Sequence, residues 1–386
     1  MARDCEPEAG RLASATGTTA ARISAARTVE EESLVSMATT TPAFGGCCVL
    51  RVVRRTLVLV LSGLAVTAAP AAAATPTRGG WDPGAQQTVM RAGVMPGVSG
   101  AGFAGDRTLT AGQLRQALVA YAGRTGGQAV TVPDGPVTVI SFDRAMVNQL
   151  GLSDVAQAVQ AETERAGLHP PSYFGTEAVA RQLGLRFTQP HGREAIELFP
   201  RDQITRAEAA WSFAKALHFN GSQQAYDRQV FMQYQLPQMT AGQRKPLRLA
   251  VSKIGMPYVW GGETDTTRGA DGPQVHGGYD CSGYVWRVFK LSGNPAGRAI
   301  SGRTAADQAG EIPRTSRIPF DGIHPADLLF FGRGSLNSGP GGINHEGIAL
   351  SGAFMINASG LGGVYVSPLF EQWRRNEFTW GRRVVF

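Results

Sequence analysis

Apolar residues recur at helical spacing through residues 85–219, where helix-like segments alternate with polar, glycine-rich turns. Two segments, FDRAMVNQLGL at 142–152 and GTEAVARQLGL at 175–185, share apolar spacing and a Gln-Leu-Gly-Leu ending at an offset of 33. A weaker echo, at an offset of 95, relates TLTAGQL at 108–114 to QITRAEA at 203–209. Self-similarity at periods of roughly 20 to 50 residues is typical of stacked supersecondary units. We therefore predict an α-helical repeat region of helix-loop-helix units over 85–219.

The end of this region carries the most specific motif of the N-terminal half. In LFPRDQITRAEAAWSFAKAL, residues 198–217, Thr205 is placed to cap a helix, and Glu208 completes a capping box. The segment resembles the end of an S-layer homology repeat, which implies non-catalytic attachment to cell-wall polymers. A plain helical spacer is the alternative. Residues 220–245, rich in Gln and Tyr, are predicted to form a linker or a bridging helix.

A different pattern occupies residues 246–386. Apolar spacing from Pro246 to Ile254 predicts a short helix, and YVWGG follows at 258–262. The polar, glycine-rich stretch 263–278 predicts a surface loop, whose acidic residues lack the order of a calcium-binding loop, so no metal site is predicted. Asp-Cys-Ser-Gly then precedes apolar residues at helical spacing, which predicts a helix that begins at Cys281. The later runs HEGIAL and AFMINAS are typical of strands.

The N-terminal segment has the pattern of an export signal. Residues 51–74 place three arginines before an apolar run of about ten residues and end in small residues, whereas a membrane span needs roughly 20 apolar residues. We predict that residues 1–74 are an N-terminal extension and signal peptide ending near Ala74, with Met37 a plausible true start. The Sec and twin-arginine routes both remain open. Residues 75–84 are a linker, and the mature chain is expected to be secreted or wall-associated, without a permanent membrane anchor.

Composition and charge narrow the class of protein. The chain of 386 residues is 43% hydrophobic and 17% charged, which is the balance of a globular protein. Its net charge of +7 favours contact with an anionic cell wall. The basic residues are scattered and form no run with interleaved aromatics, so nucleic acid is not an expected partner.

Export leaves a single cysteine. The chain has four cysteines, and three of them precede residue 75, so the mature protein retains only Cys281. A lone cysteine cannot form an internal disulfide, and it is either a small buried hydrophobe or a reactive thiol. The position of Cys281 at the start of a predicted helix favours the reactive thiol, because a helix N-terminus stabilises the thiolate that acts as nucleophile.

A thiolate enzyme also needs a base, and histidine suits that role near neutral pH. Of the six histidines, His345 alone begins a strand-like run. The next strand offers Asn357, and the turn between the strands decides its face. A two-residue turn would place Asn357 on the face opposite His345, whereas a three-residue turn at 351–353 pairs 347 with 357 and places the two side chains on one face. We predict the longer turn, with Asn357 orienting the imidazole.

Together these motifs identify a family resemblance. The order GMPYVWGG, DCSG, ADLLFF, HEGIAL and MINAS resembles the NlpC-type family of cell-wall peptidases across residues 246–386. The resemblance implies a papain-like α+β fold and no cofactor, with Cys281 as nucleophile, His345 as base and Asn357 as orienting residue. It also implies that Tyr258, Asp280 and Ser282 lie beside the substrate.

Three positions depart from the family pattern. The family usually has Gly at 326, an apolar residue at 346 and most often His at 357, where this chain has Ala326, Glu346 and Asn357. None of these changes removes the expected chemistry.

The sequence therefore predicts an exported peptidoglycan hydrolase that cleaves stem peptides, typically between D-γ-glutamate and a diamino acid. Peptidoglycan stem peptides, and wall polymers through the repeat region, are the expected partners. Two alternatives remain: a non-catalytic wall-binding protein, and an acyl or amide transferase on the same fold.

Overall fold

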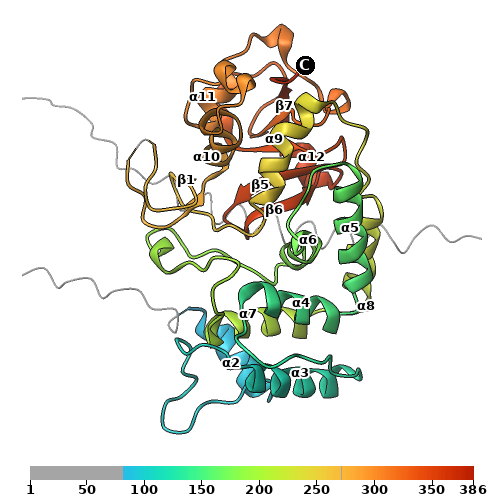
Figure 1. Cartoon of the computed structure of the whole chain (residues 1–386), viewed down its shortest axis with the longest axis vertical. Helices are drawn as coiled ribbons and strands as arrows, with labels where there is room; N and C mark the ends of the chain where they lie inside the picture. Colours follow the sequence, from blue (N-terminus) through green and yellow to red (C-terminus); the bar gives the residue numbers. More distant parts are fainter. Residues whose placement is uncertain (1–80, 271) are drawn as a thin grey trace, which may run out of the picture.

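The computed structural model describes residues 81–270 and 272–386. The predicted extension and signal peptide (1–74) and most of the predicted linker (75–84) lie outside the described residues. A helical part occupies one end of the molecule and a sheet-containing part the other (Figure 1). No helix among the described residues is long and apolar enough to cross a membrane.

The helical part extends over the first half of the described chain. Its helices are α2 (Pro83–Arg91), α3 (Ala111–Thr125), α4 (Val139–Gln149), α5 (Ser153–Arg165), α6 (Phe174–Gln182) and α7 (Arg206–Leu217), with the short helix η2 (Glu194–Ile196). Their apolar stripes meet in one core, in which Phe142, Phe174 and Phe213 are fully buried. The prediction that this half is helical agrees with the helix bounds.

Three of these helices begin in the same way. Thr110, Thr138 and Thr205 cap α3, α4 and α7, and each completes a capping box with the third helical residue. The extended residues before the helices pair with one another, through bridges 108–205, 110–136 and 138–203. The capping box predicted at Thr205 and Glu208 is therefore confirmed. The two segments that resemble each other at an offset of 95 residues contain the helix starts at Thr110 and Thr205. The third start, at Thr138, was not predicted from the sequence.

The Gln-Leu-Gly-Leu echo corresponds to two matching helix ends. Gly151 and Gly184 each have φ of +68°, the left-handed region in which glycine avoids a Cβ clash. The leucine after each glycine donates its N–H back to the helix, to Val147 O at 3.0 Å and to Ala180 O at 3.0 Å. The Gln-Leu-Gly-Leu motif thus forms the same kind of C-terminal cap on both helices.

Two helices connect the halves. α8 (Gly221–Met232) packs beside α5, so the segment 220–245 is largely ordered as a bridging helix. α9 (Ala241–Ser252) begins earlier than the helix expected from Pro246, because Thr240 and Gln243 form a capping box. Pro246 therefore lies inside the helix rather than at its start.

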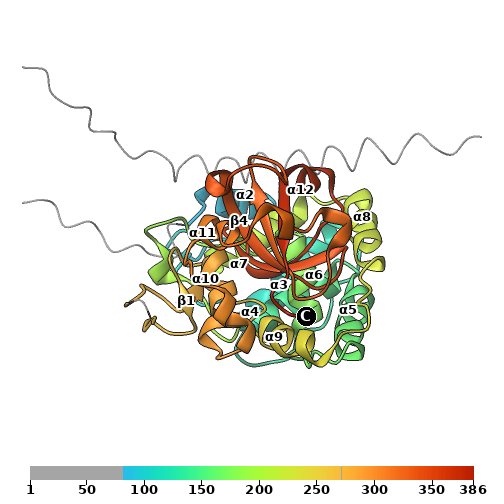
Figure 2. The same cartoon turned by 90° about the horizontal axis from the view of Figure 1, so that it is seen from above.

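The C-terminal half contains an antiparallel sheet of order β6-β5-β4-β3-β7. The strands are β3 (Leu328–Gly332), β4 (Ile343–Ala349), β5 (Phe354–Ser359), β6 (Gly363–Pro368) and β7 (Phe378–Arg382). α10 (Cys281–Val285) and α11 (Ala305–Gly310) pack against the sheet (Figure 2), and the irregular helix η3 (Trp286–Leu291) continues directly from α10. α12 (Gln372–Glu377) lies against β3, where Arg374 stacks over the Phe331 ring at 5.2 Å. This arrangement agrees with the α+β expectation.

The two ends of the predicted loop 263–278 pair as short strands, so the unpaired part of the loop is shorter than the sequence suggested. β1 (Glu263–Thr264) and β2 (Gly278–Tyr279) form a two-stranded ribbon beside α10. Its acidic side chains meet basic ones: Asp265 lies 2.5 Å from Lys253, and Glu263 lies 3.5 Å from Arg303.

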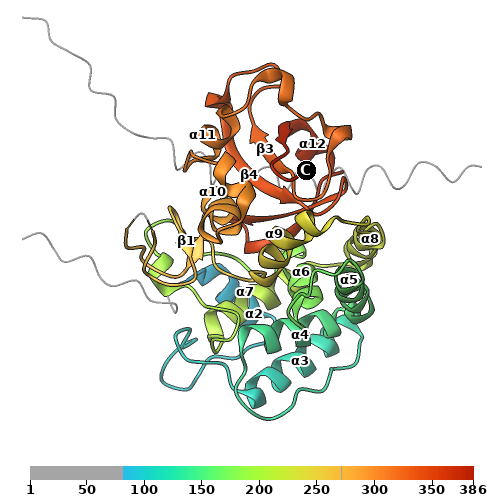
Figure 3. The same cartoon turned by 45° about the horizontal axis from the view of Figure 1, so that its top comes forward.

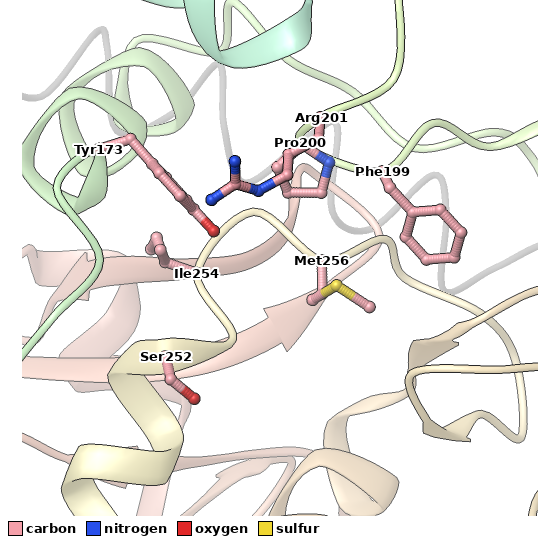
Figure 4. A pocket seen from close by; sticks show the side chains of 7 residues that line it. All are labelled: Tyr173, Phe199, Pro200, Arg201, Ser252, Ile254 and Met256. Atoms are coloured by element: carbon pink, nitrogen blue, oxygen red, sulfur yellow. The ribbon is translucent and has the colours of Figure 1, made fainter.

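Polar contacts link the two halves. Arg181 of α6 donates to Gly255 O at 3.0 Å and also to Gly362 O, while its Nε pairs with Glu177 at 2.9 Å. α6 lies directly below β6, and the view of Figure 3 shows it between the sheet and α4. A pocket of about 200 Å³ opens along this interface. Tyr173, Pro200 and Arg201 of the helical part face Ile254 and Met256 of the other half across it (Figure 4).

Candidate active site

Cys281 is the first residue of α10, as predicted. Asp280 caps this helix, and its Oδ1 accepts the Gly283 N–H at 2.5 Å. A Cβ on Gly283 would lie 1.9 Å from Gly262 O, so only glycine allows the YVWGG segment to pack on the first turn. The two motifs are thereby held together around the cysteine.

The Cys281 thiol is buried against β4. Cys281 is 9% exposed, and α10 packs against β4, from which the backbone N–H of Glu346 acts to lower the thiol pKa. Glu346 directly follows His345, so the nucleophile candidate lies against the strand that carries the base candidate.

The surroundings of Cys281 act against the resting thiolate expected from its position at a helix start. Burial raises the pKa of Cys281, and the neighbouring carboxyl groups of Asp280 and Glu346 raise it further. α10 has only five residues before the irregular η3, and an acidic side chain precedes it, so the stabilising field of its N-terminus is weak. These effects favour a neutral thiol at rest.

His345 and Asn357 form the second half of the site. His345 Nε2 lies 2.9 Å from Asn357 Oδ1. The Asn357 amide donates to Tyr365 O at 3.2 Å and to Ser367 Oγ at 2.9 Å, which fixes its oxygen toward the imidazole. Because Oδ1 can only accept, Nε2 carries the proton and Nδ1 is the basic nitrogen.

The strand register explains this contact. Ile348 pairs with Ile356 and Ala349 with Met355, so residue 347 stands opposite 357, as the longer turn requires. The register prediction is therefore confirmed. A Cβ at Gly347 would lie 3.0 Å from the Asn357 Cβ, so glycine leaves room for the amide.

The imidazole is neutral at ordinary pH. Burial and the nearby Arg374 guanidinium lower the pKa of His345 to about 3, against the opposing effect of the Asn357 hydrogen bond. A neutral imidazole can take the proton of a neutral thiol, which is the role of a general base.

The three residues predicted to lie beside the substrate gather next to Cys281. Tyr258 bridges to Tyr279 at the start of this helix, and burial together with the charges of Cys281 and Asp280 raises its pKa. Asp280 is half-buried, and its desolvation raises its pKa, while Arg303 opposes that shift. Ser282 Oγ lies 3.0 Å from Arg303 Nη1.

Arg303 is the residue that sequence reasoning missed. Its guanidinium donates to Asp280 Oδ1 at 3.1 Å, to Ser282 Oγ and to Gly261 O at 2.9 Å. It lies about twenty residues from the motif it supports, in a segment without periodicity, so no local signal marks it. It neutralises Asp280 and ties the DCSG and YVWGG motifs together.

The helical part also reaches this site. Burial raises the pKa of Tyr258, and the charge of Glu194 in η2 adds to that shift. His191 Nδ1 and Glu194 Oε1 form a hydrogen bond of 2.8 Å. The centroid of the His191 ring lies 5.8 Å from that of the Trp260 ring. The described residues hold no group of three or more His, Cys, Asp or Glu side chains placed to bind a metal ion.

Comparisons with known proteins match the part of the chain that carries this site. Residues 255–383 match the model of the NlpC/P60 family, a family of cysteine peptidases. The chain is 31% identical over 109 residues to the gamma-D-glutamyl-L-lysine dipeptidyl-peptidase of Bacillus subtilis, covering 28% of this chain and 29% of that protein. It is 34% identical over 128 residues to the peptidoglycan endopeptidase RipB of Mycobacterium tuberculosis, covering 32% and 46% respectively. The chain thus spans less than half the length of either relative.

Among solved structures, the NlpC/p60 domain of the peptidoglycan hydrolase SagA matches at 26% identity and a TM-score of 0.26, covering 36% of this chain and 97% of that one. The match to the family model, rather than this structural likeness, places an NlpC/P60 domain at residues 255–383, as the motifs implied. The family match begins at residue 255 and leaves the helical part outside it.

Proposed function

We propose that this chain is an exported peptidoglycan hydrolase that cleaves an amide bond of the stem peptide, with Cys281 as nucleophile, His345 as base and Asn357 as orienting residue. The observation that carries the proposal is the His345–Asn357 hydrogen bond of 2.9 Å, which begins on β4, the strand that packs against the helix starting at Cys281. The names of the two relatives support peptidoglycan as the substrate.

The reaction begins from the neutral pair. Nδ1 of His345 takes the thiol proton as the Cys281 sulfur attacks the substrate carbonyl carbon. The tetrahedral oxyanion is met by the Cys281 backbone N–H, and collapse transfers the proton from His345 to the leaving amine. A thioester remains, which water activated by His345 hydrolyses to the free carboxylate and thiol.

We further propose that the bond cleaved lies between D-γ-glutamate and the diamino acid. Tyr258, Asp280 and Ser282 would bind the part of the stem peptide before this bond, with Arg303 holding Asp280 and Ser282 in place. Substitutions at these positions should change the relative rates on stem peptides of different lengths. Equal loss on every substrate would reject the binding role.

The deciding experiment is digestion of purified peptidoglycan by the mature chain, followed by mass spectrometry of the soluble products. We expect fragments with a new N-terminal diamino acid, and none with Cys281→Ala. Intact peptidoglycan with both proteins would favour a non-catalytic wall-binding protein. Products that retain an added acyl or amine group would favour a transferase.

We also propose that the helical part attaches the enzyme to wall polymers, as the ITRAE segment suggests. The arginine of that segment, Arg206, is 3% exposed and donates to Phe103 O at 2.9 Å and Pro96 O at 2.6 Å, so it serves the fold. Arg144 and Arg201 are better candidates for contact. Both are exposed, and neither forms a hydrogen bond or ion pair with the described residues.

These two arginines flank one pocket. It has a volume of about 400 Å³, and its lining includes Arg144, Arg201, Tyr173 and the start of α4 at Thr138. Two guanidinium groups beside hydroxyl groups suit the acidic groups of an anionic wall glycan.

A further inference from the structure

Glu346 is a buried acid that the proposed reaction does not use. It follows His345 on β4 and is fully buried, where the family pattern has an apolar residue. Its cross-strand neighbour is Phe330, which in turn pairs with Trp380. Neither carboxyl oxygen has a hydrogen-bond partner among the described residues. An unpaired carboxylate in such a place is costly, whereas a protonated acid costs far less.

The charged groups around Glu346 are already engaged with one another. Asp280 and Cys281 face it from the start of α10, Arg303 and Glu311 from the segments flanking α11, and Arg382 from β7. Arg303 is bound by Asp280, and Arg382 by Glu311 at 2.5 Å. No cation in this group is left to balance a second negative charge. Burial and the carboxyl group of Asp280 accordingly raise the pKa of Glu346 well above its usual range.

Glu346 is also coupled to the nucleophile. Its strand, β4, packs against the helix that begins at Cys281, and its ionised side chain raises the pKa of that thiol. Negative charge develops on the same sulfur when His345 removes its proton. The two negative charges would then compete in a site of low polarity, where they repel strongly.

We propose that Glu346 is a positioning residue that must remain an uncharged acid for Cys281 to work, and that loss of its proton switches the nucleophile off at alkaline pH. This inference rests on the nucleophilic role of Cys281 in the proposed function. An apolar residue at 346 cannot ionise and would cause no loss of activity at alkaline pH. The alkaline side of the activity profile therefore distinguishes this chain from family members with an apolar residue at that position.

The test compares the pH profiles of kcat/KM and of Cys281 alkylation by iodoacetamide in the wild-type mature chain, Glu346→Gln and Glu346→Met. Each profile is normalised to its own maximum. Both variants lack the ionisable group, so we expect their alkaline limbs of kcat/KM to move up, and their alkylation midpoints to move down, by about one pH unit or more. Glu346→Met decides the matter if the glutamine variant does not fold.

The matched control is Glu197→Gln. Glu197 is also a buried acid, with its pKa raised to about 8, but the charges acting on it are Glu208, Arg186 and Arg181 rather than the nucleophile. Its substitution should leave both profiles in place. Equal shifts in Glu197→Gln and Glu346→Gln would overturn the proposal.

An infrared difference spectrum gives a readout independent of turnover. Wild type minus Glu346→Gln at neutral pH should show the carbonyl band of a protonated carboxylic acid. Absence of that band, or unchanged profiles in both Glu346 variants, overturns the inference. If the wild type hydrolyses nothing, the proposed function fails, yet alkylation and the infrared band still decide the state of Glu346.

Discussion

His345 Nε2 and Asn357 Oδ1 lie 2.9 Å apart because the strand pairing places 347 opposite 357. The amide has only one orientation that satisfies both Tyr365 O and Ser367 Oγ. The site therefore selects one imidazole tautomer before any substrate binds. That selection, rather than added basicity, is what Asn357 can contribute, since an amide carries no charge.

Asn357→Ala removes this orientation while leaving the nucleophile and base intact. We expect kcat to fall by about 10- to 1,000-fold rather than vanish, because positioning is worth a few kcal/mol. Asn357→His, which restores the residue most often found in the family pattern, should recover much of the loss. The measurement is kcat on a soluble stem peptide, with Ser367→Ala as the milder control. Complete loss in Asn357→Ala would assign the amide a direct role in chemistry.

Cys281→Ala and His345→Ala should each abolish measurable turnover, because residues that act as a unit fail together. In the substrate-free protein the raised pKa of Cys281 predicts slow alkylation at neutral pH, slower than in the denatured chain. Stopped assays with iodoacetamide between about pH 6 and 10 measure this directly. Faster labelling of the folded protein at neutral pH would show a resting thiolate and contradict the neutral pair.

Local patterns predicted the elements that carry the site. The helix at Cys281 and the pairing of β4 with β5 followed from the spacing of apolar residues and the length of one turn, which are local properties. The capping box at Thr205 followed from two residues three apart. Each of these features is encoded within one segment or one hairpin.

Electrostatics and long-range packing could not be predicted in the same way. The neutral state of Cys281 depends on burial beneath Glu346 and Asp280, and the support of Asp280 depends on Arg303 from a distant segment. Likewise, the third Thr-capped helix start, at Thr138, becomes evident only when its strand-like residues pair with those at 203. These features arise from residues that meet only in three dimensions.

Arg303→Lys should weaken the substrate side of the site. A lysine keeps the charge but cannot bridge Asp280, Ser282 and Gly261 O at once. We expect kcat/KM to fall by about tenfold or more, mostly through KM, since the loss of one charge-assisted hydrogen bond costs roughly that factor. Lys290→Arg, on the far end of η3, is the reverse exchange and should change little. A fall in kcat alone would place Arg303 in the chemical step instead.

Glu197 gives a prediction about stability. Its folded pKa of about 8 is raised above the ordinary value of 4.5, mainly by burial. Its contribution is therefore fully present below the unfolded pKa and is lost as pH rises through about 8. We expect the unfolding midpoint of the wild type to fall by about 5 °C or more between neutral and alkaline pH, and less in Glu197→Gln. Thermal scans of both proteins measure it, and parallel curves would show that Glu197 does not titrate there.

Wall attachment is tested with the full mature chain carrying Cys281→Ala, so that binding is measured without cleavage. Arg144→Gln and Arg201→Gln each remove one guanidinium from the pocket beside α4. We expect each to weaken co-sedimentation with purified walls about tenfold, because a hydrogen-bonded ion pair to an acidic group is worth about that much. The loss should disappear on walls from which anionic polymers have been extracted.

Arg107→Gln is the control that separates the pocket from net charge. Arg107 is exposed on the same helical part but lies outside the pocket lining, so its substitution removes the same charge without touching the proposed contact. General attraction of a basic protein to an anionic wall would weaken all three variants equally, and more at low salt. Selective loss in Arg144→Gln and Arg201→Gln requires a localised site instead. If all three variants sediment as the parent does, the helical part is a spacer, and attachment must come from the catalytic domain alone.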